Sequence, residues 1–70
     1  MLLKKVSFEK YVAVFDNDVT VERLSGDFTE DGRFIRRGCW VLVRDGCVVD
    51  NDYYFNDLSE RNNFEIVGSD

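Results

Sequence analysis

The first part of the chain carries a two-residue alternation of apolar and polar side chains. Between residues 6 and 15 one parity is apolar except for Lys10, and its apolar members are Val6, Phe8, Val12 and Val14. Because the side chains of a strand point alternately to its two faces, this period predicts a strand over 6–15. The polar residues 16–18, Asp-Asn-Asp, predict a turn, and 19–24 is the expected return strand. A two-residue loop at 17–18 would pair Val14 with Val21. The predicted core face is then made by Val12, Val14, Val19 and Val21.

The region from 25 to 38 carries shorter signals. Residues 25–27 break the second strand, and 28–29 form a brief apolar segment. Residues 30–33 predict a turn, because Gly32 can adopt positive φ. A short strand is expected over 34–37, and Gly38 indicates a bulge or a close backbone approach.

The clearest hairpin covers residues 39–50. Asp45-Gly46 is a preferred type I′ turn pair, and a two-residue loop there pairs Arg44 with Cys47. The same register pairs Val43 with Val48 and Leu42 with Val49. One face then carries Trp40, Leu42, Arg44, Cys47 and Val49, and the other carries Cys39, Val41, Val43 and Val48. Both faces are apolar, so we expect one to line the core and the other to be covered by another element or by a partner. The two cysteines fall on opposite faces, which predicts two free thiols and no disulfide.

The last twenty residues mix aromatic and acidic side chains. Residues 53–55 predict extended backbone. Asp57 followed by Glu60 resembles a capping box, so a short helical turn is expected over 57–62. Residues 64–67 predict a final short strand.

These signals predict a mainly β domain that spans residues 1–70. The expected architecture is a small antiparallel barrel, SH3-like or OB-like, or a curled sheet, with five to six short strands and one helical turn near 57–62. An antiparallel sheet with one short helix against it is the alternative.

Charge narrows the class of partner. The chain has 70 residues, a formal net charge of −5 and two cysteines. A negative charge disfavours nucleic acid and anionic lipid as partners. The chain has no stretch of about 18 apolar residues, so we expect no membrane span. Charges interrupt the first ten residues too early for a signal peptide, so we expect a cytoplasmic protein.

Catalysis and metal binding find little support. There is no histidine to act as a general base, no Gly-rich phosphate loop, and the carboxylates lie in turn-like segments. The tripeptide Asp-Asn-Asp occurs at 16–18 and 50–52, but neither copy has calcium-loop spacing, and the cysteines lack zinc-ligand partners. We therefore expect no enzyme activity, no cofactor and no metal.

An arginine-rich window suggests one alternative function. Four of the nine basic residues lie between 33 and 44, with two aromatic residues among them. Small barrels bind single-stranded nucleic acid with such groups, and the candidate set is Arg33, Arg36, Arg37 and Trp40. Fourteen acidic residues and the opposite directions expected of Arg36 and Arg37 oppose this interpretation.

Protein binding is the favoured interpretation. Carboxylates surround a run of aromatic residues after the hairpin, a combination in which charge steers encounter and aromatics supply affinity. The candidate contact set is Asp50, Asp52, Tyr53, Tyr54, Asp57 and Glu60. The competing explanation is that the tyrosines and Phe55 complete the core.

The sequence thus predicts a small acidic inhibitor or adaptor that binds the basic surface of a larger protein. Small acidic domains are common among virus-encoded proteins that block host enzymes, so one version is a viral protein that mimics nucleic-acid charge. The third alternative is a structural or assembly subunit that forms a homodimer through the apolar hairpin or an edge strand.

Overall fold

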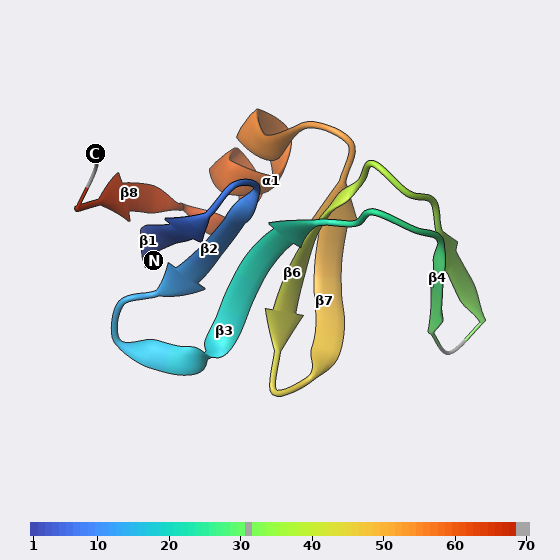
Figure 1. The fold of residues 1–70 in the computed structure, drawn as a ribbon, viewed down its shortest axis with the longest axis horizontal. Helices are drawn as coiled ribbons and strands as arrows, with labels where there is room; N and C mark the ends of the chain where they lie inside the picture. The colour runs from blue at the N-terminus through green and yellow to red at the C-terminus, as the bar shows by residue number, and fades with distance from the viewer. Residues whose placement is uncertain (31, 69–70) are drawn as a thin grey trace.

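The computed structural model describes residues 1–30 and 32–68, and within them eight strands and one helix follow one another (Figure 1). In chain order they are β1 (Leu2–Ser7), β2 (Lys10–Ala13), β3 (Asp16–Arg23), β4 (Phe28–Glu30), β5 (Arg33–Ile35), β6 (Trp40–Arg44), β7 (Cys47–Asp52), α1 (Phe55–Asn62) and β8 (Glu65–Val67). Six strands form one sheet in the order β7-β6-β3-β2-β1-β8, while β4 and β5 form a separate hairpin. The predicted mainly β fold with one short helix is confirmed.

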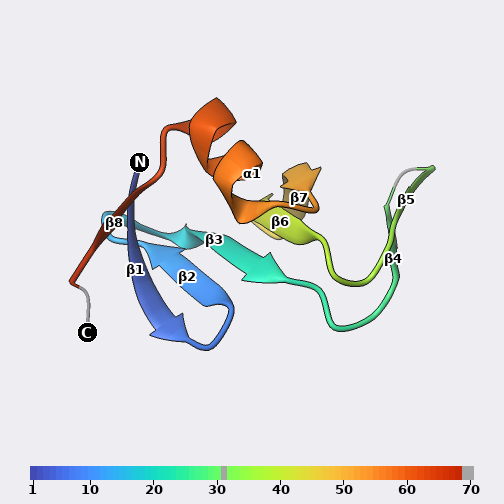
Figure 2. The same ribbon diagram turned by 90° about the horizontal axis from the view of Figure 1, so that it is seen from above.

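The large sheet is open, with β7 and β8 at its edges. Neighbouring strands from β7 to β1 run antiparallel, whereas β8 runs parallel to β1, with Ile66 opposite Leu3. A parallel neighbour needs a crossover, and α1 provides it by passing over one face of the sheet from β7 towards β8 (Figure 2). The chain therefore forms the sheet with a helix against it that was the alternative expectation, and not a closed barrel, and its described residues form eight strands where five to six were expected.

The main core lies between α1 and the sheet. Leu58 of the helix is fully buried, and four half-buried aromatic rings surround the contact. Phe55 is central among them, with its ring centroid 5.1 Å from that of Tyr11 and 5.0 Å from that of Trp40. The buried residues of this cluster are Leu3, Ala13, Val19, Val21, Leu42 and Leu58.

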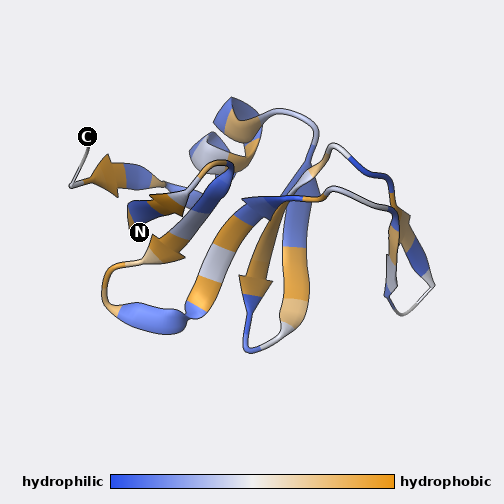
Figure 3. Cartoon of the chain, in the orientation of Figure 1, coloured by the Kyte–Doolittle hydropathy of each residue, from blue (hydrophilic) through white to orange (hydrophobic). Residues whose placement is uncertain are grey.

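A second, smaller core lies on the other face of β6 and β7, whose apolar stretches run side by side (Figure 3). Val41 and Val48 from these strands pack there with Cys39 and with Ile35 of β5. The prediction that both faces of the 39–50 hairpin are apolar, with the second face covered by another element, is confirmed.

The register of the β6–β7 hairpin is partly as predicted. Asp45 and Gly46 have φ angles of 53° and 82°, as a type I′ turn requires, and Arg44 pairs with Cys47. Beyond Val43 the register shifts, so that Leu42 lies opposite Asp50 instead of the expected Val49. A bulge of this kind moves the following side chains to the other face, which turns Asp50 towards the helix.

The predicted strand over 6–15 is wrong, because a turn at Phe8-Glu9 divides it between β1 and β2. Glu9 has a φ of 62° in this turn. Lys10, the polar residue that broke the parity, is where β2 begins. A second turn at Val14-Phe15 leads into β3.

The expected turn at 16–18 is instead the irregular start of β3, where the N–H of Asp18 donates to Asp16 Oδ1 at 3.1 Å. Tyr11 therefore lies opposite Val21, the place predicted for Val14. Of the four valines predicted for the core, Val19 and Val21 are buried. Val12 is half-buried and Val14 is exposed.

The shorter predictions hold with shifted ends. The helix begins two residues earlier than expected, and its N-cap is Tyr54, without a side-chain capping bond, so the capping box at Asp57 is wrong. Phe55, the first residue of the helix, and Leu58 both pack in the main core. The expected strands at 34–37 and 64–67 correspond to β5 and β8, and the short segment at 28–29 lies in β4. Position 31 of the predicted 30–33 turn lies outside the described residues.

We expect Leu58→Ala to lower the free energy of unfolding by about 2–5 kcal/mol, because it opens a cavity between α1 and the sheet. Alanine preserves helix propensity, so the loss reports packing. Urea unfolding followed by circular dichroism measures it. The control is Val49→Ala at the β7 bulge, where the side chain is 49% exposed. It should cost no more than about 1 kcal/mol. Equal losses in the two variants would contradict the packing of α1 on the sheet.

Candidate protein-binding surface

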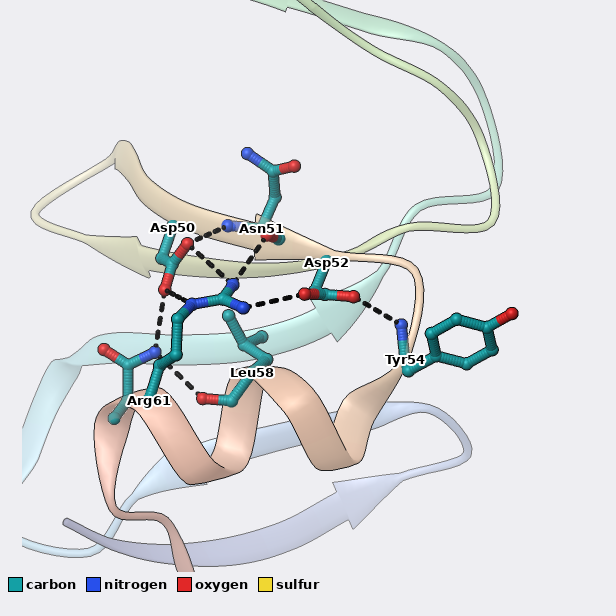
Figure 4. A network of polar contacts seen from close by, with 7 residues as sticks. Asp50, Asn51, Asp52, Tyr54, Leu58 and Arg61 are labelled. Carbon is teal, nitrogen blue, oxygen red and sulfur yellow. Dashed lines mark hydrogen bonds and ion pairs between the residues drawn. The ribbon is translucent and has the colours of Figure 1, made fainter.

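The acidic residues at the end of β7 are held by an arginine of the helix. Because of the bulge, Asp50 and Asp52 lie opposite Leu42 and Trp40, on the face that α1 covers. Arg61, in the last turn of α1, binds both (Figure 4). Its Nη2 and Nε lie 3.0 and 3.2 Å from the two carboxylate oxygens of Asp50, and its Nη1 lies 2.8 Å from Asp52 Oδ2. We call Arg61, Asp50, Asp52 and Asn62 the Arg61 clamp.

Further hydrogen bonds complete the clamp. Arg61 Nη2 also donates to the carbonyl oxygen of Asn51 at 3.0 Å. Asn62 Nδ2 donates to Asp50 Oδ2 and to the Leu58 carbonyl, each at 2.9 Å. A bidentate guanidinium–carboxylate contact is both stronger and more directional than a single ion pair. The clamp therefore fixes the end of α1 to the β7 edge of the sheet.

The pKa values of the three ionisable residues of the clamp are shifted. The hydrogen bond from Arg61 is the main cause that lowers the pKa of Asp50 below its ordinary value of 3.8. The pKa of Asp52 is also lowered, first by the hydrogen bond from the Tyr54 N–H and then by the bond from Arg61. The two carboxylates raise the pKa of Arg61 in turn. All three groups are therefore charged at neutral pH and their charges are satisfied within the fold.

The corner between β7 and α1 presents two tyrosines to solvent. Asp52 Oδ1 accepts a hydrogen bond of 3.0 Å from the Tyr54 N–H, which fixes the backbone, and the Tyr54 ring points away from Asp52 (Figure 4). Tyr53 is 55% exposed and Tyr54 is 70% exposed. Of the aromatic run, Phe55 completes the core, as the competing explanation expected, and the tyrosines do not.

Helix α1 adds two exposed carboxylates. Asp57 and Glu60 are exposed and stand three residues apart, so they share one side of the helix. Neither forms an ion pair with a residue in the described ranges. We call Tyr53, Tyr54, Asp57 and Glu60 the Tyr54 surface. It contains four of the six predicted contact residues, while Asp50 and Asp52 already bind Arg61.

The residues of the arginine-rich alternative do not gather on one surface. Trp40 is half-buried beside α1, 6.1 Å from Tyr11 between ring centroids. Arg33 belongs to β5, and Arg36 and Arg37 follow it, all three exposed. Trp40 therefore packs against the main core instead of presenting its ring for stacking on a base.

The most exposed aromatic side chains were not among the predicted site residues. Phe8 and Phe15 are 83% and 85% exposed, one in the turn before β2 and the other in the turn after it. Phe15 lines a hollow of about 200 Å³ together with Met1, Leu2, Ala13, Asp16, Val19 and Arg44. The predicted strand over 6–15 included both residues, whereas the structure places each of them in a turn.

The described residues contain neither a cluster of metal ligands nor a disulfide. Across residues 1–30 and 32–68, no three His, Cys, Asp or Glu residues form a group that could hold a metal ion. Cys39 is buried in the second core, Cys47 is exposed at the start of β7, and both are free. The described part of the chain has no helix of the length and hydrophobicity that a bilayer crossing requires.

Comparisons of the chain with protein families, with curated proteins and with solved structures found no match.

We expect Arg61→Gln to destabilise the fold in a pH-dependent way. The pKa values of Asp50 and Asp52 are lowered on folding, so their stabilising effect is complete above their ordinary value of 3.8 and is lost as the pH falls through the lowered values. The wild type should therefore exceed the variant in urea midpoint at about pH 7, and the difference should shrink below about pH 4.

The control for this experiment is Arg44→Gln, which removes an exposed arginine without an ion pair to any described residue. Its urea midpoint should follow that of the wild type across the pH range. A difference between Arg61→Gln and wild type that stays constant with pH would contradict the clamp.

Proposed function

We propose that this chain is a small acidic protein-binding domain that occupies a basic surface on a larger cytoplasmic protein, as an inhibitor or adaptor. The observation that carries the proposal is the Tyr54 surface, where two exposed tyrosines directly precede a helix with two exposed carboxylates that have no ion pair within the described residues. The proposal involves binding alone and no catalysis.

The composition of the Tyr54 surface suits recognition. Tyrosine rings give large contact areas and are enriched among the residues that dominate binding energy. Asp57 and Glu60 would steer a positively charged partner and fix its orientation, which matters more for association rate and specificity than for affinity. In the inhibitor version, these carboxylates would take the place of nucleic-acid phosphates on a basic groove.

Rigid placement of the tyrosines favours binding further. The Asp52–Tyr54 hydrogen bond and the Arg61 clamp hold the β7–α1 corner before any partner arrives. A preorganised surface loses less conformational freedom on binding than a flexible loop would. On this proposal Asp50 and Asp52 support binding indirectly, by positioning Tyr54.

Affinity capture from lysate with the tagged chain tests the proposal. We expect Tyr54→Ala and Glu60→Lys to lose a specific protein that the wild type retains. Phe8→Ala is the matched control, since it removes an even more exposed aromatic ring from another part of the chain and should retain the protein. Once the captured protein is purified, Tyr54→Ala should raise the dissociation constant of its complex with this chain at least about 30-fold.

The control variants also define failure. If Tyr54→Ala and Glu60→Lys keep every specific partner while Phe8→Ala loses one, the functional surface is the one around Phe8. Asp52→Lys is avoided as a probe, because it would disrupt the Arg61 clamp as well as the surface charge.

A further inference from the structure

The outer edge of β1 is covered along only half of its length. β1 has six residues, and β8 pairs in parallel with the first three, residues 2–4. On its inner side β1 pairs with β2 as far as Ser7, so the sheet extends past the end of β8. Gly68, which follows β8, has a φ of 64° and leaves the extended conformation. No strand in the described ranges pairs with the outer edge of residues 5–7, which we call the β1 notch.

A hollow of about 430 Å³ follows the β1 notch. Its lining comes from residues 4–7 of β1, from Tyr11 of β2, and from Ile66 and Gly68 at the end of β8. Val6 is 51% exposed and Ile66 is 42% exposed, so apolar surface accompanies the backbone edge. An open strand edge accepts a further strand, whose backbone hydrogen bonds supply affinity while neighbouring side chains supply specificity.

The described lining of this hollow is positively charged. It contains Lys4 and Lys5, both exposed, and no acidic residue. Neither lysine forms an ion pair with a described residue. The two lysines are neighbours in a strand, so they point to opposite faces of the sheet. A partner strand in the β1 notch would therefore meet one ammonium group on each of its faces.

Nearby carboxylates leave this charge in place. Strands β1, β2 and β8 together hold three lysines and one carboxylate, Glu65, which gives them a formal charge of +2. Glu9, in the turn between β1 and β2, is bound to Arg23 at 2.7 Å. Glu22 lies opposite Lys10 on β3, the second strand from β1. Adjacent strands are about 4.8 Å apart and the Debye length is about 8 Å at physiological salt, so carboxylates on β3 and beyond are largely screened at the notch.

Charge and backbone together define the occupant. An extended segment with two adjacent carboxylates offers one to each lysine, and β-branched residues on either side of them would pack on Val6 and Ile66. We propose that the β1 notch binds an extended acidic segment of a partner protein, which joins the sheet as an additional strand in line with β8. A basic segment would form the same backbone hydrogen bonds but bring like charges together.

The β1 notch differs from the Tyr54 surface in place and in charge. β1 lies beside β8 at one edge of the sheet, whereas Tyr53 and Tyr54 follow β7 at the other edge. The Tyr54 surface has carboxylates for a basic partner, and the notch has lysines for an acidic one. A chain with both surfaces suits an adaptor, which holds two partners at once, so the inference goes beyond the proposed function.

A capped peptide, Thr-Val-Glu-Glu-Val-Thr, is the probe, and the full chain labelled with ¹⁵N is the target. Titration should shift the amide NMR signals of residues 5–7 and of Ile66 most, with a dissociation constant below about 1 mM. The same peptide with glutamine in place of both glutamates should bind at least about tenfold more weakly. N-methylation of every second residue, in either frame, removes the donors of one peptide edge, so one of the two frames should abolish binding.

Variants of the chain test the lysines. Lys5→Glu should weaken binding of the glutamate peptide at least about tenfold, because it sets a carboxylate against the peptide. Arg33→Glu is the control, since it changes the net charge from −5 to −7 as Lys5→Glu does but lies on β5, at the other end of the long axis (Figure 1). It should bind like the wild type. The double variant Lys4→Glu with Lys5→Glu should prefer a peptide with two lysines in place of the glutamates.

Four results would overturn the inference. They are amide shifts that are largest outside the β1 notch, equal binding of the glutamate and glutamine peptides, an Arg33→Glu loss equal to that of Lys5→Glu, and a notch that is already occupied by a second copy of the chain, seen in sedimentation as a dimer that Lys5→Glu dissociates. The two proposals fail separately, because Tyr54→Ala should leave peptide binding unchanged and Lys5→Glu should leave the capture that depends on Tyr54 unchanged.

Discussion

Helix α1 has to be held against a six-stranded sheet by very few side chains, and the rest of the fold depends on that contact. Leu58 fills the interface and Phe55 joins the rings of Tyr11 and Trp40. The helix covers the apolar face of the sheet and also carries the chain from the β7 edge to the β8 edge. The Arg61 clamp adds direction to this packing, because a guanidinium bound to two carboxylates and a carbonyl oxygen allows only a narrow range of helix orientations.

Local signals in the sequence predicted only part of the local structure. Asp45-Gly46 requires only that two neighbouring residues take positive φ, and its turn forms as expected. The alternation over 6–15 misled because two interrupting turns kept most of the parity intact while reversing the chain direction. The pairing of β8 with β1 joins residues more than sixty positions apart, and no local pattern specifies such a neighbour.

The candidate site was also predicted only in part from the sequence. The exposed tyrosines and the carboxylates of α1 were found from composition alone, because aromatic residues among acids stand out in any sequence. The fate of Asp50 and Asp52 was not foreseeable, since it depends on a one-residue register shift after Val43 that turns both towards Arg61. The same shift leaves Val49 exposed at the edge of the sheet. A single inserted residue therefore changed two expected contact residues into structural ones.

The parallel pairing of β1 with β8 also constrains how the chain reaches its fold. Leu3 pairs with Ile66, so this contact closes a loop of more than sixty residues and carries an entropic cost. Folding rates fall as contacting residues become more distant in sequence. During synthesis β1 can form its hairpin with β2 early, but its other edge stays unpaired until residue 67 has left the ribosome. For that interval, the exposed edge of β1 is open to mispairing with another nascent chain.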